Sequence, residues 1–176
     1  AALAGGAAAL SPLTLRGEQP AAGQSRTYSL AYLTVFGCPP PEMTYLAKRA
    51  GYDYVSLRPI SMNLPGEPVF DLARNAALLS QTRTALASTG LGVHDIELAR
   101  IGDGVDVRTW EPALQVGAEL GATRVIASIW TADRVFAQEA FIRLCELARP
   151  LGFTIDLEFV TFASLRTLKE ARDFQI

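Results

Sequence analysis

Residues 124–160, RVIASIWTADRVFAQEAFIRLCELARPLGFTIDLEFV, decide the fold because they contain one strand–helix–strand unit. The apolar runs Arg124–Trp130 and Thr154–Val160 are predicted strands, and the helical pattern Asp133–Leu151 lies between them. The first residue of that helix suits an N-cap, and Gly152 suits the left-handed position that ends a helix. Strands joined by a helical crossover pair in parallel, so this unit predicts a parallel sheet.

The same alternation of strand and helix extends over the chain from Tyr28 onward. Predicted strands are Ser29–Val35, Tyr54–Ile60, Gly92–Ala99, Arg124–Trp130 and Thr154–Val160. Predicted helices are Pro41–Ala50, Asp71–Thr89, Trp110–Leu120 and Asp133–Leu151, and a last one begins near Ser164. Five strand–helix units of this kind indicate an α/β fold with a parallel sheet.

Two α/β architectures are compatible with five units. An open, doubly wound sheet is complete with five strands, whereas a (β/α)8 TIM barrel needs eight units and about 250 residues. Counting alone favours the open sheet. The chain ends at Ile176 partway along a helical pattern without a cap, however, which favours residues 28–176 as a partial TIM-barrel domain.

Composition limits the class of partner. The chain has 176 residues, a formal net charge of -2 and scattered basic residues, which argues against nucleic-acid binding. No apolar run reaches about 18 residues, so no membrane-spanning helix is expected. Cys38 and Cys145 show neither zinc-ligand spacing nor a disulfide framework. A cytoplasmic location is therefore the default expectation.

Residues 1–27 differ in composition from the rest. Ala1–Leu10 is rich in Ala and Gly, and Ser11–Thr27 is rich in Pro, Gly, Gln and Ser. The first part resembles the apolar core of an export signal, which would make the protein periplasmic or exported. A disordered tail is the alternative interpretation, and neither is counted in the fold.

Two acidic triplets lie inside otherwise apolar predicted strands: Asp95-Ile-Glu97 and Asp156-Leu-Glu158. Strand alternation places both carboxylates of each triplet on one face and the apolar residues on the other. In a barrel this face points inward, and Glu158 lies nearest the carboxyl-end mouth, where active sites lie. Since alternate strands fill the same interior layers, Glu97 and Glu158 could approach one site. Buried carboxylates need a cation or hydrogen-bond donors, so a metal or acid–base site and a structural ion-pair network are both open.

Four further residues have weaker claims to function. Arg58, near the end of the second strand, could anchor a substrate phosphate or carboxylate, or could pair with Glu97. The hydroxyl of Tyr32, on the first strand, could contact substrate. Trp130 could form an apolar wall for a ligand at the carboxyl-end mouth of the barrel. His94 is the single histidine. Strand alternation places its side chain on the face toward the helices, so it is not expected to be catalytic.

Several of these runs together resemble the sugar phosphate isomerase/epimerase family of the xylose isomerase-like TIM barrel superfamily. The runs are Tyr28–Val35, Ala47–Arg58, Asp95–Leu98, Gly117–Ala122 and Asp156–Phe159. The resemblance implies a barrel with a divalent ion, Mn²⁺, Mg²⁺ or similar, held by a fifth-strand Glu and by ligands from later strands. Glu158 matches that Glu, and the chain ends before the other ligands. Relatives often carry His where Tyr32 stands.

The resemblance also implies an activity. Such enzymes remove a proton next to a carbonyl of a sugar, sugar phosphate or related keto-polyol, and an enediolate forms. Two rivals remain open. The first is a phosphodiesterase related to the endonuclease branch of the superfamily, which a single histidine disfavours. The second is an inactive barrel fragment that pairs its exposed strands with a partner or with a second copy of itself.

Overall fold

The computed structural model describes residues 26–174 and contains one five-stranded parallel sheet. The proposed tail or signal remnant falls almost wholly on residues outside this range. The strands follow the predicted order along the chain: β1 Ser29–Ala31, β2 Tyr54–Leu57, β3 Gly92–Ile101, β4 Arg124–Ile129 and β5 Thr154–Glu158.

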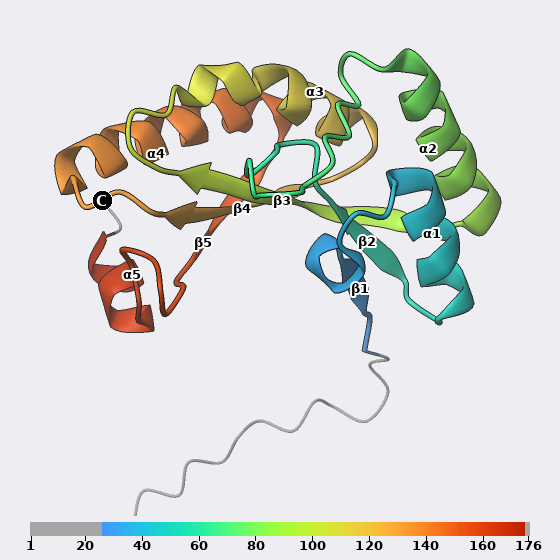
Figure 1. Ribbon diagram of the computed structural model, residues 1–176, viewed down its shortest axis with the longest axis horizontal. Coiled ribbons are helices and arrows are strands. Elements are labelled where there is room, and N and C mark those ends of the chain that lie inside the picture. The colour runs from blue at the N-terminus through green and yellow to red at the C-terminus, as the bar shows by residue number, and fades with distance from the viewer. Residues whose placement is uncertain (1–25, 175–176) are drawn as a thin grey trace, which may run out of the picture.

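The helices also follow the predicted order. They are α1 Pro40–Arg49, α2 Ala76–Thr89, α3 Glu111–Glu119, α4 Arg134–Ala148 and α5 Leu168–Phe174. Three short 3₁₀ helices lie between these elements: η1 Tyr32–Val35, η2 Val107–Trp110 and η3 Arg149–Leu151. As Figure 1 shows, α2, α3 and α4 line one side of the sheet, and α1 packs beside α2.

Sheet topology separates the two architectures. The spatial order is β1-β2-β3-β4-β5, so each strand pairs with its neighbour in sequence and no reversal of order occurs. A doubly wound sheet requires such a reversal and carries helices on both faces. The doubly wound alternative is therefore wrong, and the described sheet is an arc of barrel wall.

The two faces of this arc differ sharply in polarity. The outer face contacts the helices and carries fully buried apolar side chains, among them Val55, Ile96, Val125 and Ile129. The opposite face, here called the inner face, carries polar and charged side chains. Its members on the central and C-terminal strands are Asp95, Arg100, Arg124, Ser128, Asp156 and Glu158. In a closed barrel this face would line the interior.

Helix ends agree with the predicted signals at two positions and differ at a third. The Asp133 side chain accepts a hydrogen bond from the Phe136 N–H and caps α4, and Gly152 has a φ of 81°. The predicted helix start at Asp71 is wrong because Asn75 caps α2 instead. The Asp71 carboxylate accepts from the Arg74 N–H in a separate turn, which competes with helix formation.

The first predicted strand is too long. It ends at Ala31, and η1 occupies Tyr32–Val35, so Tyr32 does not lie on a strand. The Glu97 carboxylate accepts a hydrogen bond from the Leu33 N–H at 3.2 Å, which ties this 3₁₀ turn to β3. Short apolar runs do not distinguish strand from helix by periodicity, and here a tertiary contact decides the outcome.

Two irregularities interrupt the pairing of β3. Val93 and Asp95 of β3 pair with two consecutive residues of β2, Val55 and Ser56. His94 is therefore an extra residue without a partner in β2. On the β4 side, β3 advances three residues from Ile96 to Ala99, while β4 advances two residues from Val125 to Ala127. Each irregularity shifts the alternation of side chains by one position. Consequently Arg100, which strict alternation would send outward, pairs with Ser128 on the inner face.

The first irregularity also reverses the predicted direction of His94. Its ring lies 5.6 Å from that of Tyr54, and its Nε2 lies 3.9 Å from Asp95 Oδ2. About half of the side chain is exposed. The prediction that His94 faces the helices is wrong, because it assumed an unbroken two-residue period.

Close packing of α3 on β3 makes Gly117 sensitive to substitution. A Cβ at Gly117 would lie 2.2 Å from Ile96 Cδ1 and 2.9 Å from Ile96 Cγ1. We expect Gly117→Ala to lower the free energy of unfolding by about 1–3 kcal/mol in urea denaturation, the usual cost of overpacking. Combining it with Ile96→Val removes the closer contact and should restore part of that loss.

Ile96→Val alone is the control, with an expected cost of about 0.5–1.5 kcal/mol. If Gly117→Ala matched the unsubstituted protein in stability, the close approach of α3 to β3 would be contradicted.

Candidate active site at the carboxyl ends of the strands

The carboxyl ends of β3, β4 and β5 bring three polar residues into one row. Arg100 pairs in register with Ser128, and Ser128 pairs with Glu158. Adjacent strands lie about 4.8 Å apart, so the backbones of Arg100 and Glu158 are about 10 Å apart across Ser128. Active sites of TIM barrels lie at this end of the strands. This row is therefore the candidate site.

Trp130 forms one wall of the candidate site. Its indole N–H donates a hydrogen bond to Ser128 Oγ at 2.7 Å, which fixes the ring orientation. The Arg100 guanidinium carbon lies 4.2 Å from the ring centroid, and the Phe162 ring lies 5.7 Å away. An aromatic wall beside a few polar groups is typical of small-molecule sites.

Glu158 is the carboxylate with no assigned structural partner in this row. Within the described part of the chain it forms neither a hydrogen bond nor an ion pair. Partial burial raises the pKa of its carboxyl group above the ordinary Glu value. A carboxylate with a raised pKa and free lone pairs is suited to accept and return a proton.

Asp156 has a structural role instead. Arg124 donates two hydrogen bonds to its carboxylate, at 2.6 and 2.7 Å. The ion-pair interpretation is therefore confirmed for Asp156. Asp95 differs: it is 5% exposed, its Oδ1 has no partner among the described residues, and burial raises the pKa of its carboxyl group.

A buried charge cluster holds Arg58 on the β1–β2 side of the sheet. Its Nη1 lies 3.2 Å from Glu67 Oε1, its Nη2 lies 3.9 Å from Glu97 Oε1, and its guanidinium covers the Tyr32 ring at 4.8 Å. These contacts favour the structural-bridge interpretation of Arg58. Glu67 was missed by sequence reasoning, because nothing in its loop marks it as the partner of a distant arginine.

Tyr32 and Glu97 belong to the same cluster. Tyr32 is 2% exposed, and its hydroxyl accepts a hydrogen bond from the Gly37 N–H at 3.2 Å. Burial raises the pKa of the Glu97 carboxyl group, and the Arg58 charge partly offsets this effect. Glu97 lies about three residues farther from the carboxyl end than Arg100. The structure therefore does not place Glu97 in the row with Glu158.

The described residues do not fit a complete metal site. No group of three or more His, Cys, Asp or Glu side chains within residues 26–174 is arranged to hold a metal ion. Divalent Mg²⁺ requires about six oxygen ligands, and a single carboxylate at Glu158 supplies one or two. Any metal bound here would need ligands from outside this set.

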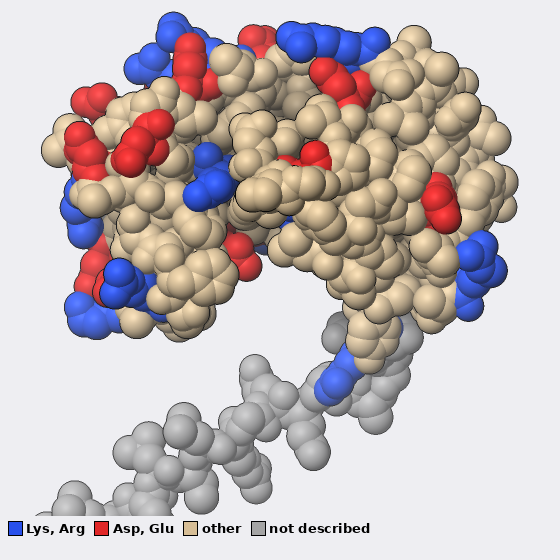
Figure 2. All heavy atoms as spheres, in the orientation of Figure 1, with Lys and Arg blue, Asp and Glu red and all other residues tan. Residues whose placement is uncertain are grey.

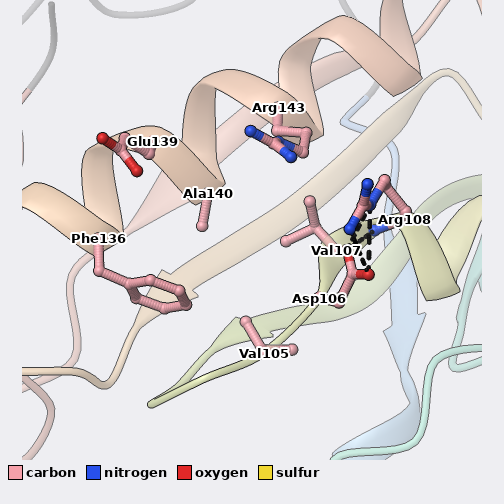
Figure 3. A pocket seen from close by; sticks show the side chains of 8 residues that line it. All are labelled: Val105, Asp106, Val107, Arg108, Phe136, Glu139, Ala140 and Arg143. Carbon is pink, nitrogen blue, oxygen red and sulfur yellow. Dashed lines mark hydrogen bonds and ion pairs between the residues drawn. The ribbon is translucent and has the colours of Figure 1, made fainter.

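A separate hollow of about 250 Å³ lies between the β3–α3 loop and α4. In Figure 3, Phe136, Glu139 and Arg143 project into it from α4, opposite Arg108. Arg108 is already paired with Asp106, its Nε lying 2.9 Å from the carboxylate. None of the predicted site residues lines this hollow, so it is not part of the candidate site.

Surface features bear on two further expectations. On the face shown in Figure 2, acidic and basic side chains are interspersed and do not gather into one basic area. Exclusion of nucleic acid stays a prediction. Among the helices of residues 26–174, none combines the length and apolarity needed to cross a bilayer.

Comparison with known proteins supports the fold at the level of structure. No protein-family model and no curated protein matches the sequence. A xylose isomerase domain-containing protein from Salmonella typhimurium LT2 superposes with a TM-score of 0.64 at 20% identity, over 83% of this chain and 54% of that one. The described residues have the fold of part of a xylose isomerase-like TIM barrel.

Two further structures agree. The IOLI protein, described with a bound zinc atom, has a TM-score of 0.63 at 17% identity over 83% of this chain and 56% of that one. A sugar phosphate isomerase/epimerase from Parabacteroides distasonis ATCC 8503 has a TM-score of 0.53 at 15% identity, over 78% and 52%. The chain thus spans about half the length of these structures.

Arg58→Met tests the buried cluster. The substitution would leave Glu67 and Glu97 buried without their cation, so we expect the free energy of unfolding to fall by about 3–5 kcal/mol in urea denaturation. Arg100→Met is the matched control. It breaks no ion pair within the described residues and should cost about 1 kcal/mol or less. Equal losses in the two variants would contradict a structural role specific to Arg58.

Asp95→Asn tests the buried carboxyl group. A raised folded-state pKa means that the folded protein binds the proton more tightly, so stability falls as pH rises through the window above the ordinary Asp pKa of about 3.9. We expect Asp95→Asn to raise the free energy of unfolding at pH 7, with the difference shrinking toward pH 4. Asp156→Asn should instead lower stability at pH 7 because it breaks the Arg124 pair. Destabilisation by Asp95→Asn at both pH values would overturn this assignment.

Proposed function

We propose that this protein is an isomerase or epimerase that acts on a sugar, sugar phosphate or related keto-polyol by proton transfer next to a carbonyl. The observation that carries the proposal is the row at the carboxyl ends of β3 to β5, where Glu158 has a raised pKa and no described partner. The shared fold with xylose isomerase-like and sugar phosphate isomerase/epimerase proteins supports the class of reaction.

Glu158 would act as the acid–base group. Its carboxylate removes a proton from the carbon next to the carbonyl, and the C–H electron pair forms the C=C bond of an enediolate while the carbonyl oxygen takes the negative charge. Return of the proton to the former carbonyl carbon, with the hydroxyl proton passing from the oxygen of the first carbon to the former carbonyl oxygen, gives the isomer. Delivery of a proton to the opposite face of the first carbon by a second donor, while the oxyanion re-forms the carbonyl, gives the epimer. Glu158 is exposed, so substrate can reach its carboxyl group, and the raised pKa favours both halves of this transfer.

Trp130 would orient the substrate. The indole offers an apolar wall for the carbon skeleton, and the fully buried Ser128 hydroxyl holds the ring by accepting a hydrogen bond from its N–H. Arg58, Tyr32 and Glu97 were expected to contact substrate or to take part in acid–base catalysis. Their burial in one cluster of contacts favours a structural role beside β1 and β2.

Dependence on a divalent ion such as Mn²⁺ or Mg²⁺ is a separate part of the proposal. Glu158 is the described carboxylate that could serve as a ligand, and the bound zinc of the IOLI structure supports metal use in proteins of this fold. The described residues do not complete such a site, so the proton-transfer role above is derived from the protein groups alone.

A second candidate function rests on the sheet edges. β1 and β5 each pair with one strand within the described sheet, so each has one edge without a described partner. Such edges favour pairing with another chain, and an interaction domain or homo-oligomer would follow. The endonuclease-like alternative has no support beyond the single His94, which lies on the N-terminal half of β3.

Glu158→Gln in the complete protein tests the acid–base role. We expect the variant to lose about 10²-fold or more in kcat, because general acid–base catalysis contributes roughly this factor. Exchange of substrate C–H hydrogen with D₂O, followed by NMR over a panel of ketoses and ketose phosphates, measures the step directly. The acid limb of kcat/KM should lie above the ordinary Glu pKa of about 4.3.

Glu119→Gln, an exposed change on α3, is the control and should keep activity within about twofold. Retention of exchange and turnover by Glu158→Gln would exclude Glu158 as the acid–base residue. Calorimetric titration with Mn²⁺ separates the metal question. Binding that Glu158→Gln abolishes would support a ligand role, and no binding by the complete protein would remove the metal from the proposal. Absence of exchange together with dimer formation would favour the interaction domain.

A further inference from the structure

Arg100 is a cation without a counter-ion at one end of the candidate site. Among the described residues it forms no ion pair, and its Nε is buried without a hydrogen-bond acceptor. An unsatisfied donor on a charged group is costly, because the group gives up water without gaining a partner. The Nε atom is buried, so an acceptor from outside the chain would meet the terminal Nη groups and would compensate the charge of the guanidinium.

Other arginines at or near this face are already neutralised. Arg58 pairs with Glu67 and Arg124 pairs with Asp156. Nε and Nη2 of Arg58 are also buried without a hydrogen-bond acceptor, but two carboxylates compensate the charge of that guanidinium.

Arg100 lies on the inner face of β3, one position after Ala99, where regular pairing with β4 resumes. Arg134 and Arg166, which follow β4 and β5, form no ion pair among the described residues either, but each donates a hydrogen bond to a backbone carbonyl. Arg100 differs from them because its guanidinium has neither a carboxylate nor a carbonyl acceptor among the described residues.

Contacts around Arg100 hold it in place without using its donors. Its guanidinium lies over the Trp130 ring at 4.2 Å, and the indole is itself fixed by its hydrogen bond to Ser128. Stacking occupies a face of the planar guanidinium and leaves its N–H donors, which lie in the plane, free for an acceptor. This fork matches the oxygens of a carboxylate or phosphate in geometry and charge.

We propose that Arg100, held by Trp130, binds an anionic end of the substrate, so that the site selects phosphorylated or carboxylated polyols over neutral ones. This inference rests on the proposed function, because it assigns the substrate class of the same site. Glu158 lies on the other side of Ser128, about 10 Å away between backbones. The anionic group and the reacting carbon would then occupy opposite ends of a short molecule.

Binding of simple probes by the complete protein tests the inference without requiring turnover. The probes are inorganic phosphate, glycerol 3-phosphate and D-glycerate, with glycerol as the neutral control. Trp130 fluorescence in a Trp110→Phe background reports binding beside the indole, and calorimetry gives the affinity. We expect the three anions to bind and glycerol not to compete. Tighter binding of glycerol 3-phosphate than of D-glycerate would identify phosphate as the preferred group.

Arg100→Gln should weaken binding of the anionic probes by at least tenfold, and Arg100→Lys should restore part of the affinity because it keeps the charge but loses the planar fork. Arg49→Gln is the matched control. Arg49 is exposed in the last turn of α1, at the opposite end of the strands, and its substitution should leave affinity unchanged.

Two outcomes overturn the inference: no anion binding by the unsubstituted protein, or equal affinity after Arg100→Gln. Its failure is distinguishable from failure of the proposed function. Glu158→Gln should retain the affinity for inorganic phosphate while losing proton exchange, because the two residues act on different parts of the substrate. If anion binding depends on Arg100 but the unsubstituted protein shows no proton exchange, the isomerase proposal is contradicted and the anion site is supported.

Discussion

The departures of β3 from regular pairing control what the inner face can do. β3 is the central strand and the longest, and both of its neighbours meet it across an irregular register. The first irregularity turns His94 toward the inner face, and the second does the same for Arg100. With regular alternation, Arg100 would face the helices and the carboxyl ends of the strands would lack their cation. A local change in backbone pairing thus sets the electrostatic character of the site.

The charges on the inner face divide into those that are paired and those that are not. Arg58 with its two glutamates, and Arg124 with Asp156, form closed groups whose main effect is on stability. Arg100 and Glu158 lie at the end of the strands and have no partner in the described residues. Arg100 and Glu158 share a row at the carboxyl ends of β3 to β5, where a ligand would enter.

Local sequence patterns, namely hydrophobic periodicity and helix-capping residues, predicted most of the fold. The periodicity of each run predicted all five strands and the order of the helices, and Asp133 and Gly152 marked the ends of α4 and its 3₁₀ extension correctly. Glu158 was identified from the acidic triplet in β5. Its place at the strand end agrees with that reasoning, and its role stays a prediction.

Features that depend on pairing between distant residues were not predictable in this way. The 3₁₀ turn at Tyr32 depends on a hydrogen bond to β3, and the partner of Arg58 comes from a loop. Arg100 was overlooked because the strand was expected to end at Ala99 and because alternation pointed it outward. An extra residue in a strand leaves no mark on hydrophobic periodicity, since it becomes visible only against the neighbouring strand.

The sequential order of the strands has a consequence for how this chain folds. Every pair of adjacent strands is separated by one helix, so each contact in the sheet closes a loop of about the same modest length, and the entropy lost on closure grows only slowly with that length. Each strand of the described sheet pairs with the strand next to it in sequence. A fold nucleus formed by β3, α3 and β4 could therefore extend outward one unit at a time, in the way that local contacts speed the folding of small domains.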